Sequence, residues 1–154
     1  MTPVTPVTVN ATAKTIILVD DHEMFRDALC AYLARESDLQ VIAQTGSGQE
    51  GCVLVAERRP DVLVVDIELP DLDGISLTRT VRALSPPPAV LILSVYAEAT
   101  HYARALAVGA AGYICKDETA EDLMEAIRTV ARGGTWFRTL AGRGRGPTGS
   151  TLLS

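Results

Sequence analysis

The chain has 154 residues, of which 47% are hydrophobic and 21% are charged, and its formal net charge at pH 7 is -5. This size predicts one globular domain with a substantial core, and the acidic balance gives no indication of nucleic-acid binding. No apolar run reaches the roughly 18 residues of a membrane span, and the start of the chain lacks the pattern of a signal peptide. The three cysteines include no CxxC pair, which favours reduced thiols in a cytoplasmic protein without a membrane anchor.

Composition divides the chain into three parts. Residues 1–13 are rich in Thr, Pro and Val, and we expect a disordered leader there. Residues 137–154 are rich in Gly, Arg and Ser and predict a disordered tail. The folded domain is therefore expected to occupy residues 14–136.

Strand-like and helical patterns alternate through this predicted domain. In chain order, the apolar spacing predicts a strand at 14–20, a helix around Phe25–Leu33, a strand at 39–45, a helix at 49–58, a strand at 61–66, a helix at 75–84, a strand at 89–94, a helix at 98–109, a strand at 112–115 and a last helix around Leu123–Ala131. The first, third and fourth strands are continuously apolar, as expected where helices cover both faces of a parallel sheet. The fold class is therefore α/β, and ligands are expected beyond the carboxyl ends of the strands.

Reactive side chains follow four of these five strands. Asp20 and Asp21 end the first strand, Asp66 ends the third, Ser94 ends the fourth, and Lys116 follows the fifth. Because the carboxyl ends of parallel strands lie at the same edge of a sheet, we expect these groups to lie close together.

Three neighbouring carboxylates repel one another unless a cation offsets their charge, and oxygen-only ligands suit Mg²⁺. A carboxylate is also a nucleophile toward phosphorus, and phosphoryl transfer depends mainly on positioning and charge neutralisation. Mg²⁺, Lys116 and the Ser94 hydroxyl would each face a phosphoryl oxygen. Taken singly, these residues have ordinary alternatives, since Asp21 could cap the first helix and Asp66 could cap a turn.

The sequence resembles a response-regulator receiver domain from about Lys14 to Trp136. The resemblance depends on LVDDHEMFRDAL (18–29), VVDIELPDLDG (64–74), LILSVYAEA (91–99) and AAGYICKD (110–117). The segments DDHEMFR and GYICKD are most similar to the NarL/LuxR-type two-component regulators. The family implies a flavodoxin-like (βα)5 fold, with a five-stranded parallel sheet in the order 2-1-3-4-5 and helices on both faces.

The resemblance also implies a role for each residue at the predicted edge. Asp66 would be the phosphoacceptor, and Asp20, Asp21, Asp66 and the backbone carbonyl of Glu68 would hold Mg²⁺. Lys116 would pair with the phosphoryl group. Ser94 would be the switch hydroxyl, and Tyr113 the aromatic residue that changes rotamer with it.

The function implied by the resemblance is signalling rather than conventional catalysis. A sensor histidine kinase would donate the phosphoryl group, and the domain would catalyse only its own phosphotransfer and dephosphorylation. The modified domain would change conformation to control an output, and a second copy of the chain could read the changed face. In this family type the output is usually transcription, through a C-terminal helix-turn-helix domain that binds DNA. The residues after Trp136 show no helical repeat, so we expect no DNA-binding domain in this chain, either because it is a truncated form or because the receiver surface acts alone.

Two alternatives remain from the sequence. GSGQEG at 46–51 matches the GxGxxG string of dinucleotide-binding loops, and it follows a strand and opens a helix. That interpretation leaves Asp20, Asp21, Ser94 and Lys116 without a role, and a tight turn into a helix is simpler. The other alternative is a receiver-like adaptor that works without phosphorylation, which would not explain the complete set of acids.

Overall fold

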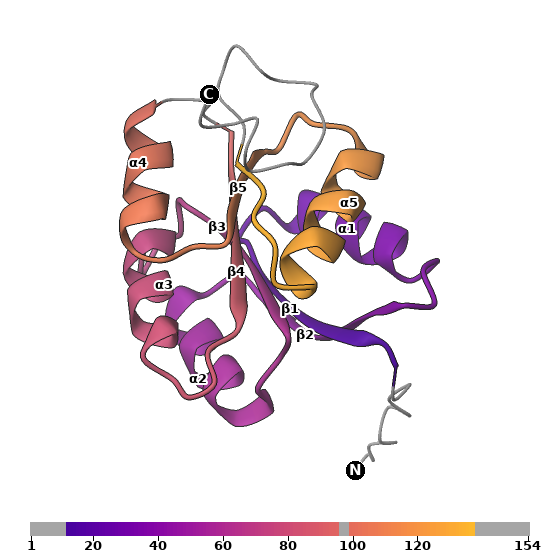
Figure 1. Cartoon of the computed structure of the whole chain (residues 1–154), viewed down its shortest axis with the longest axis horizontal. Coiled ribbons are helices and arrows are strands. Elements are labelled where there is room, and N and C mark those ends of the chain that lie inside the picture. The colour runs from indigo at the N-terminus through magenta and orange to yellow at the C-terminus, as the bar shows by residue number, and fades with distance from the viewer. Residues whose placement is uncertain (1–11, 96–98, 138–154) are drawn as a thin grey trace.

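The computed structural model describes residues 12–95 and 99–137, and Figure 1 shows their arrangement. The elements are β1 (Lys14–Val19), α1 (Glu23–Leu33), β2 (Leu39–Thr45), α2 (Gly48–Arg58), β3 (Val62–Asp66), α3 (Gly74–Arg82), β4 (Ala89–Ser94), α4 (Ala99–Ala107), β5 (Gly112–Cys115) and α5 (Ala120–Ala131). The predicted order of strands and helices is confirmed, with ends that differ from the prediction by less than one helical turn. The predicted leader and tail lie outside the described residues, apart from Thr12, Ala13 and Phe137.

The strands form one parallel sheet in the order β2-β1-β3-β4-β5, as the resemblance implied. The register places Val19 of β1 beside Val65 of β3, and Ser94 of β4 beside Cys115 of β5. Within the described residues, all four strand pairs are parallel, so every strand ends at the same edge of the sheet.

Two apolar layers hold the helices against the sheet. Alternate residues of a strand point to opposite faces, so Ile16 and Leu18 face one layer while Ile17 and Val19 face the other. Helices α1 and α5 cover the first face, and α2, α3 and α4 cover the second (Figure 1). Burial of both faces explains why β1, β3 and β4 read as continuous apolar runs.

Close packing and capping fix the helices. A Cβ at Gly51 would lie 2.8 Å from Cγ2 of Val19, so glycine lets α2 approach β1 closely. Gly109, two residues after α4, has a φ of 87°, a left-handed conformation that glycine commonly adopts where a helix ends. The side chains of Ser47, Asp73 and Thr119 accept hydrogen bonds from the first turns of α2, α3 and α5 respectively.

The backbone after α5 returns to the sheet edge. Gly112 and Trp136 form a parallel bridge, in which the N–H of Tyr113 donates to the carbonyl of Trp136 at 2.9 Å. Trp136 is buried in the same apolar layer as Ile127 of α5. Phe137, placed in the predicted tail, is buried in the opposite layer, so the packed core reaches at least this residue. Among the described residues, no helix combines the length and apolar composition needed to cross a bilayer.

Candidate functional site

Three carboxylates meet where β1 and β3 end. Asp20 directly follows β1, Asp66 is the last residue of β3, and the two strands are neighbours in the sheet. One carboxylate oxygen from each of Asp20, Asp21 and Asp66 lies within 4.8 Å of the others. Asp20 and Asp66 are buried and Asp21 is exposed, so the cluster opens to solvent on the Asp21 side.

Lys116 reaches this cluster from beyond β5. Its Nζ lies 2.8 Å from Oδ2 of Asp20 and 3.0 Å from Oδ2 of Asp66, and its side chain is only 7% exposed. Its backbone N–H donates to the carbonyl of Ser94 at 2.8 Å, which extends the β4–β5 ladder by one residue. The lysine is therefore fixed at both ends, by the sheet and by the carboxylates.

The remaining oxygens of the two buried acids are held by their own loops. Oδ1 of Asp20 accepts the N–H of His22 at 2.8 Å, and Oδ1 of Asp66 accepts the N–H of Glu68 at 3.1 Å. In each carboxylate the other oxygen, Oδ2, faces Lys116. The backbone thus orients both carboxylates so that Oδ2 of each points toward Lys116.

The structure also tests the helix-capping and turn-capping roles that Asp21 and Asp66 could have had. His22, not Asp21, is the N-cap of α1, and its side chain makes no capping hydrogen bond. Asp66 does accept a hydrogen bond within its own turn, so its turn-capping role and its place in the cluster exist together.

The environment changes the acidity of Asp66. Burial raises the pKa of Asp66 above its ordinary value, and the negative charge of Asp20 adds to the rise. The N–H of Glu68 and the ammonium of Lys116 hold this pKa down in part. The ionised carboxylate therefore carries a free-energy cost that additional positive charge would relieve.

The donor set fits a hard divalent cation. Three carboxylates against one ammonium leave two negative charges at the cluster, if all are ionised. Oδ2 of Asp20 is buried, accepts no hydrogen bond from the part of the chain that the structure describes, and has the Lys116 ammonium as its ion-pair partner at 2.8 Å. A buried oxygen with an unused lone pair beside two further carboxylates is what Mg²⁺ ligation requires.

Comparison with known proteins identifies the family. Residues 16–128 match the family described as the response regulator receiver domain. The chain belongs to this family. The receiver domain is 34% identical over 129 residues to the transcriptional regulatory protein DegU of Brevibacillus brevis, and 34% identical over 122 residues to the response regulator protein VraR of Staphylococcus aureus. These matches cover 84% and 79% of this chain but 55% and 58% of the relatives, so the chain spans little more than half their length.

Solved structures place the receiver domain among NarL- and LuxR-type regulators, as its motifs indicated. The signal receiver domain of the putative response regulator NarL from Mycobacterium tuberculosis superposes with a TM-score of 0.76 at 29% identity, covering 79% of this chain and 98% of that one. A LuxR-family regulator from Aurantimonas gives a TM-score of 0.78 at 28% identity, covering 84% and 91%.

The two predicted switch residues of the receiver domain lie on adjacent strands. Ser94 ends β4 and is fully buried, and Tyr113 of β5 pairs with Ile92, two residues earlier on β4. Because residues two apart share a face, Ser94 and Tyr113 face the same side of the sheet. Tyr113 is only 6% exposed, and its ring centroid lies 6.2 Å from that of Tyr102 on α4. The ring of Tyr113 is therefore already packed inward.

A cavity of about 410 Å³ lies above the acids of the receiver domain. Its lining residues come from the loops after β1, β3, β4 and β5 and from the end of β3: Asp21, His22, Asp66, Glu68, Leu69, Pro70, Val95 and Lys116. Glu68 is exposed there, two residues beyond Asp66. The structure therefore places Asp21, Asp66, Glu68 and Lys116 around one opening, with Asp20 buried behind them.

The loop after β3 packs against the GSGQEG segment (46–51) and accounts for its glycine at position 48. Asp71 accepts hydrogen bonds from Oγ of Ser47 at 2.7 Å, from the N–H of Gly48 at 2.8 Å and from the N–H of Gln49 at 3.0 Å. A Cβ at Gly48 would lie 2.5 Å from the carbonyl oxygen of Leu72. The donors that would cradle a dinucleotide phosphate thus hold the carboxylate of Asp71, and they lower the pKa of this group to about 2.

Sequence reasoning missed one neighbour of the cluster. The Phe25 ring centroid lies 4.7 Å from Nζ of Lys116. In the sequence, Phe25 has the helical spacing of a core residue, and it does pack against the apolar layer under α1. No sequence signal separates this second contact from ordinary burial.

Proposed function

We propose that the receiver domain accepts a phosphoryl group on Asp66 from the phosphohistidine of a sensor histidine kinase. The main support is the Asp66 carboxylate, which is buried at the end of β3, turned by the N–H of Glu68 and paired with Lys116 at 3.0 Å. Burial is the largest cause of the raised pKa of Asp66, and the N–H of Glu68 and the ammonium of Lys116 act against that rise.

In the proposed step, an oxygen of Asp66 attacks phosphorus. A P–O bond forms as the P–N bond of the donor breaks, and the imidazole keeps the electron pair and takes a proton from water. Lys116 neutralises charge on the transferred group, since its ammonium already lies against Asp66. Water attack on the same phosphorus later restores Asp66, so the domain catalyses only its own modification and its reversal.

Asp20, Asp21, Asp66 and the backbone carbonyl of Glu68 are the proposed Mg²⁺ ligands. The ion would supply charge neutralisation for the phosphoryl oxygens. The protein's own contribution is preorganisation, because Asp20 and Asp66 are each held by a backbone N–H before any ligand arrives.

The proposed switch couples Asp66 to the α4–β5–α5 face. Ser94 would turn its hydroxyl toward the phosphoryl group, and Tyr113 would fill the space on the same face of the sheet. Since Tyr113 is already packed against Tyr102, phosphorylation would mainly stabilise an inward ring that the unmodified domain also adopts.

The wider role follows from the relatives. DegU is named as a transcriptional regulatory protein, and we propose that this chain likewise serves transcriptional control in the cytoplasm. DNA would be bound only by an output domain outside this chain, and a second copy of the domain is the proposed partner for the changed face. The proposed division of the chain is a leader (1–13), a receiver that begins at residue 14 and extends through the buried Phe137, and a tail after it.

Labelling tests the central proposal. The parent chain, mixed with Mg²⁺ and a small phosphodonor such as acetyl phosphate, should gain a hydroxylamine-sensitive phosphoryl group, and Asp66→Ala should not. Glu57→Gln is the matched control, because it removes one exposed carboxylate from the solvent side of α2. Labelling of Asp66→Ala would refute the assignment, and no labelling of the parent would favour the phosphorylation-independent adaptor.

A further inference from the structure

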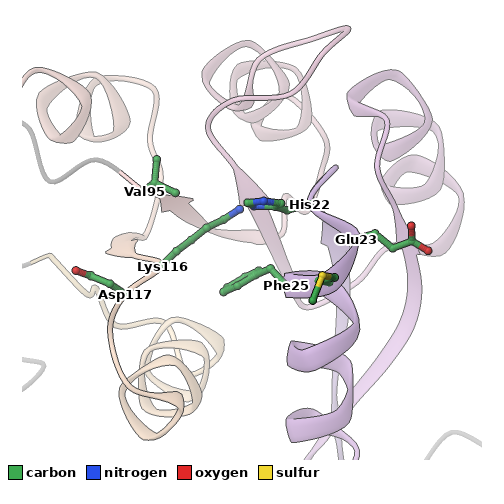
Figure 2. A pocket seen from close by; sticks show the side chains of 7 residues that line it. His22, Glu23, Phe25, Val95, Lys116 and Asp117 are labelled. Atoms are coloured by element: carbon green, nitrogen blue, oxygen red, sulfur yellow. The ribbon is translucent and has the colours of Figure 1, made fainter.

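Phe25 lies where α1 faces the ammonium of Lys116. The ring is half-buried, and its centroid is 4.7 Å from Nζ, within the range of a cation–π contact. Figure 2 shows the Lys116 side chain extending toward α1 with the Phe25 ring beside it. The contact involves the residue that pairs with both buried acids, so it lies at the centre of the proposed chemistry.

Two cavities are lined by both partners of this contact. One, of about 520 Å³, is lined by His22, Glu23, Met24, Phe25, Val95, Lys116 and Asp117 (Figure 2). The other, of about 180 Å³, is lined by Phe25, Ala28, Leu29, Tyr32, Lys116, Glu118, Ala120 and Leu123. Phe25 and Lys116 are the residues common to both. The aromatic ring therefore provides packing for the lysine in a region where the neighbouring space is open.

Two carboxylates and one aromatic ring contact the Lys116 ammonium. Asp20 and Asp66 attract the ammonium at 2.8 and 3.0 Å, and both belong to the sheet edge. The ring of Phe25 offers the negative face of its π-system from α1. The ammonium is thus held by two carboxylates and an aromatic face, which together restrict the rotation of a long and flexible side chain.

We propose that Phe25 is a positioning residue for phosphoryl transfer, whose ring holds the Lys116 ammonium against Asp66 where the incoming phosphoryl group must meet it. This inference depends on the proposed function of Asp66. Loss of the ring would join the two cavities around Lys116 and let the ammonium and water occupy that space. The effect should appear in the rate of the transfer step, because the charge of Lys116 would remain while its position would be lost.

Fluorination of the ring gives the sharpest test. Phe25 would be replaced by 4-fluoro-, 3,5-difluoro- and 3,4,5-trifluorophenylalanine, which weaken the π-face in steps with little change in shape. The maximal rate of Mg²⁺-dependent labelling by acetyl phosphate should fall at each step, and Phe25→Leu should lower it by about 3- to 30-fold. The donor concentration at half-maximal rate should change less, because donor binding is not the affected step.

Tyr32→Leu is the matched control. Tyr32 is an aromatic residue of the same helix that lines the smaller cavity, and Cζ of Arg35 lies 5.6 Å from its ring centroid. This variant therefore enlarges that cavity and keeps the Phe25 ring against Lys116. It should leave the labelling rate within twofold of the parent, a limit that we set to separate a local effect from a general loss of helix packing. The free energy of unfolding, measured in urea for each fluorinated protein, should remain close to that of the parent.

A second measurement does not depend on phosphorylation. A proton near an aromatic face is shifted upfield, so the Hε resonances of Lys116 should move downfield along the fluorinated series and most in Phe25→Leu. If the parent is labelled and the labelling rate is the same in all the fluorinated proteins, the positioning role is overturned and the proposed function is left intact. A parent chain that cannot be labelled would overturn both the positioning role and the proposed function. Hε resonances of Lys116 that are the same in Phe25→Leu as in the parent would disprove the contact itself.

Discussion

Replacing Asp66 with Asn should stabilise the metal-free domain. At an effective dielectric constant of about 20, two like charges no more than 4.8 Å apart repel by at least ~3.5 kcal/mol, and opposite charges 3.0 Å apart attract by ~5.5 kcal/mol. Repulsion from Asp20, with a smaller screened contribution from Asp21, therefore offsets most of the attraction to Lys116. What remains is the desolvation of Asp66, the largest cause of its raised pKa. We expect Asp66→Asn to raise the free energy of unfolding by about 1–2 kcal/mol at pH 7.

The pH dependence has a definite sign. The folded-state pKa of Asp66 is raised, so its contribution to stability is fully present below the unfolded value of 3.8 and is lost as the pH rises through the folded value. The stability advantage of Asp66→Asn should therefore grow as the pH rises from the unfolded pKa of Asp66 through its folded pKa. The measurement is urea unfolding in EDTA at a series of pH values, with Glu57→Gln as the control for an equal change in net charge.

Magnesium should reverse the order of stability. Mg²⁺ at 100 times its Kd would add about 2.7 kcal/mol to the parent, and less to Asp66→Asn, which has lost a carboxylate ligand. The reasoning is refuted if Asp66→Asn is the less stable protein in EDTA, or if Mg²⁺ stabilises both proteins equally.

Three further changes probe other parts of the structure. Lys116→Ala should still show stabilisation by Mg²⁺ in a thermal melt but should lose phosphorylation-dependent dimerisation on a sizing column, and parental behaviour there would contradict its role. Asp71→Ala should make the domain unfold more easily in acid, because the pKa of Asp71 is lowered to about 2 in the folded state. The stabilising effect of the Asp71 carboxylate is present above the ordinary pKa of 3.8 and is lost as the pH falls through about 2. Circular dichroism between pH 2 and pH 5 checks this, and identical acid transitions would exclude it. Gly74→Ala should lower the free energy of unfolding by about 1–3 kcal/mol in urea, since the new Cβ would lie 2.4 Å from the carbonyl oxygen of Asp66; an unchanged value would mean that the loop can shift.

Periodicity and composition predicted most of the fold for identifiable reasons. Strands β1, β3 and β4 are buried on both faces, which makes them continuous apolar runs that are easily recognised. The start of α1 was harder, because Glu23 and Met24 are exposed and only Phe25 begins the buried stripe. The order of strands could not come from spacing, because helices of similar length connect each pair, and it was taken correctly from the family resemblance.

The sequence alone predicted only those site residues that lie at the ends of strands. Asp20 and Lys116 directly follow parallel strands and Asp66 ends one, so the three converge by a rule that needs no knowledge of the loops. Asp71 lies in the middle of a loop, and its hydrogen bonds to the start of α2 depend on how that loop crosses the helix. Phe25 has two environments at once, the apolar layer and the lysine, and sequence spacing reveals only the first.

The short pairing of Trp136 with β5 closes the outer edge of the sheet with the chain's own backbone. The N–H of Trp136 donates to the carbonyl of Ala111 at 3.0 Å, and the next residue, Phe137, meets the Tyr102 ring edge-on at a centroid distance of 5.2 Å. A foreign strand could add beside Gly112 only by displacing Trp136. Because Tyr102 also packs on Tyr113, tension on the chain at Phe137 would be transmitted directly to the aromatic rings of Tyr102 and Tyr113.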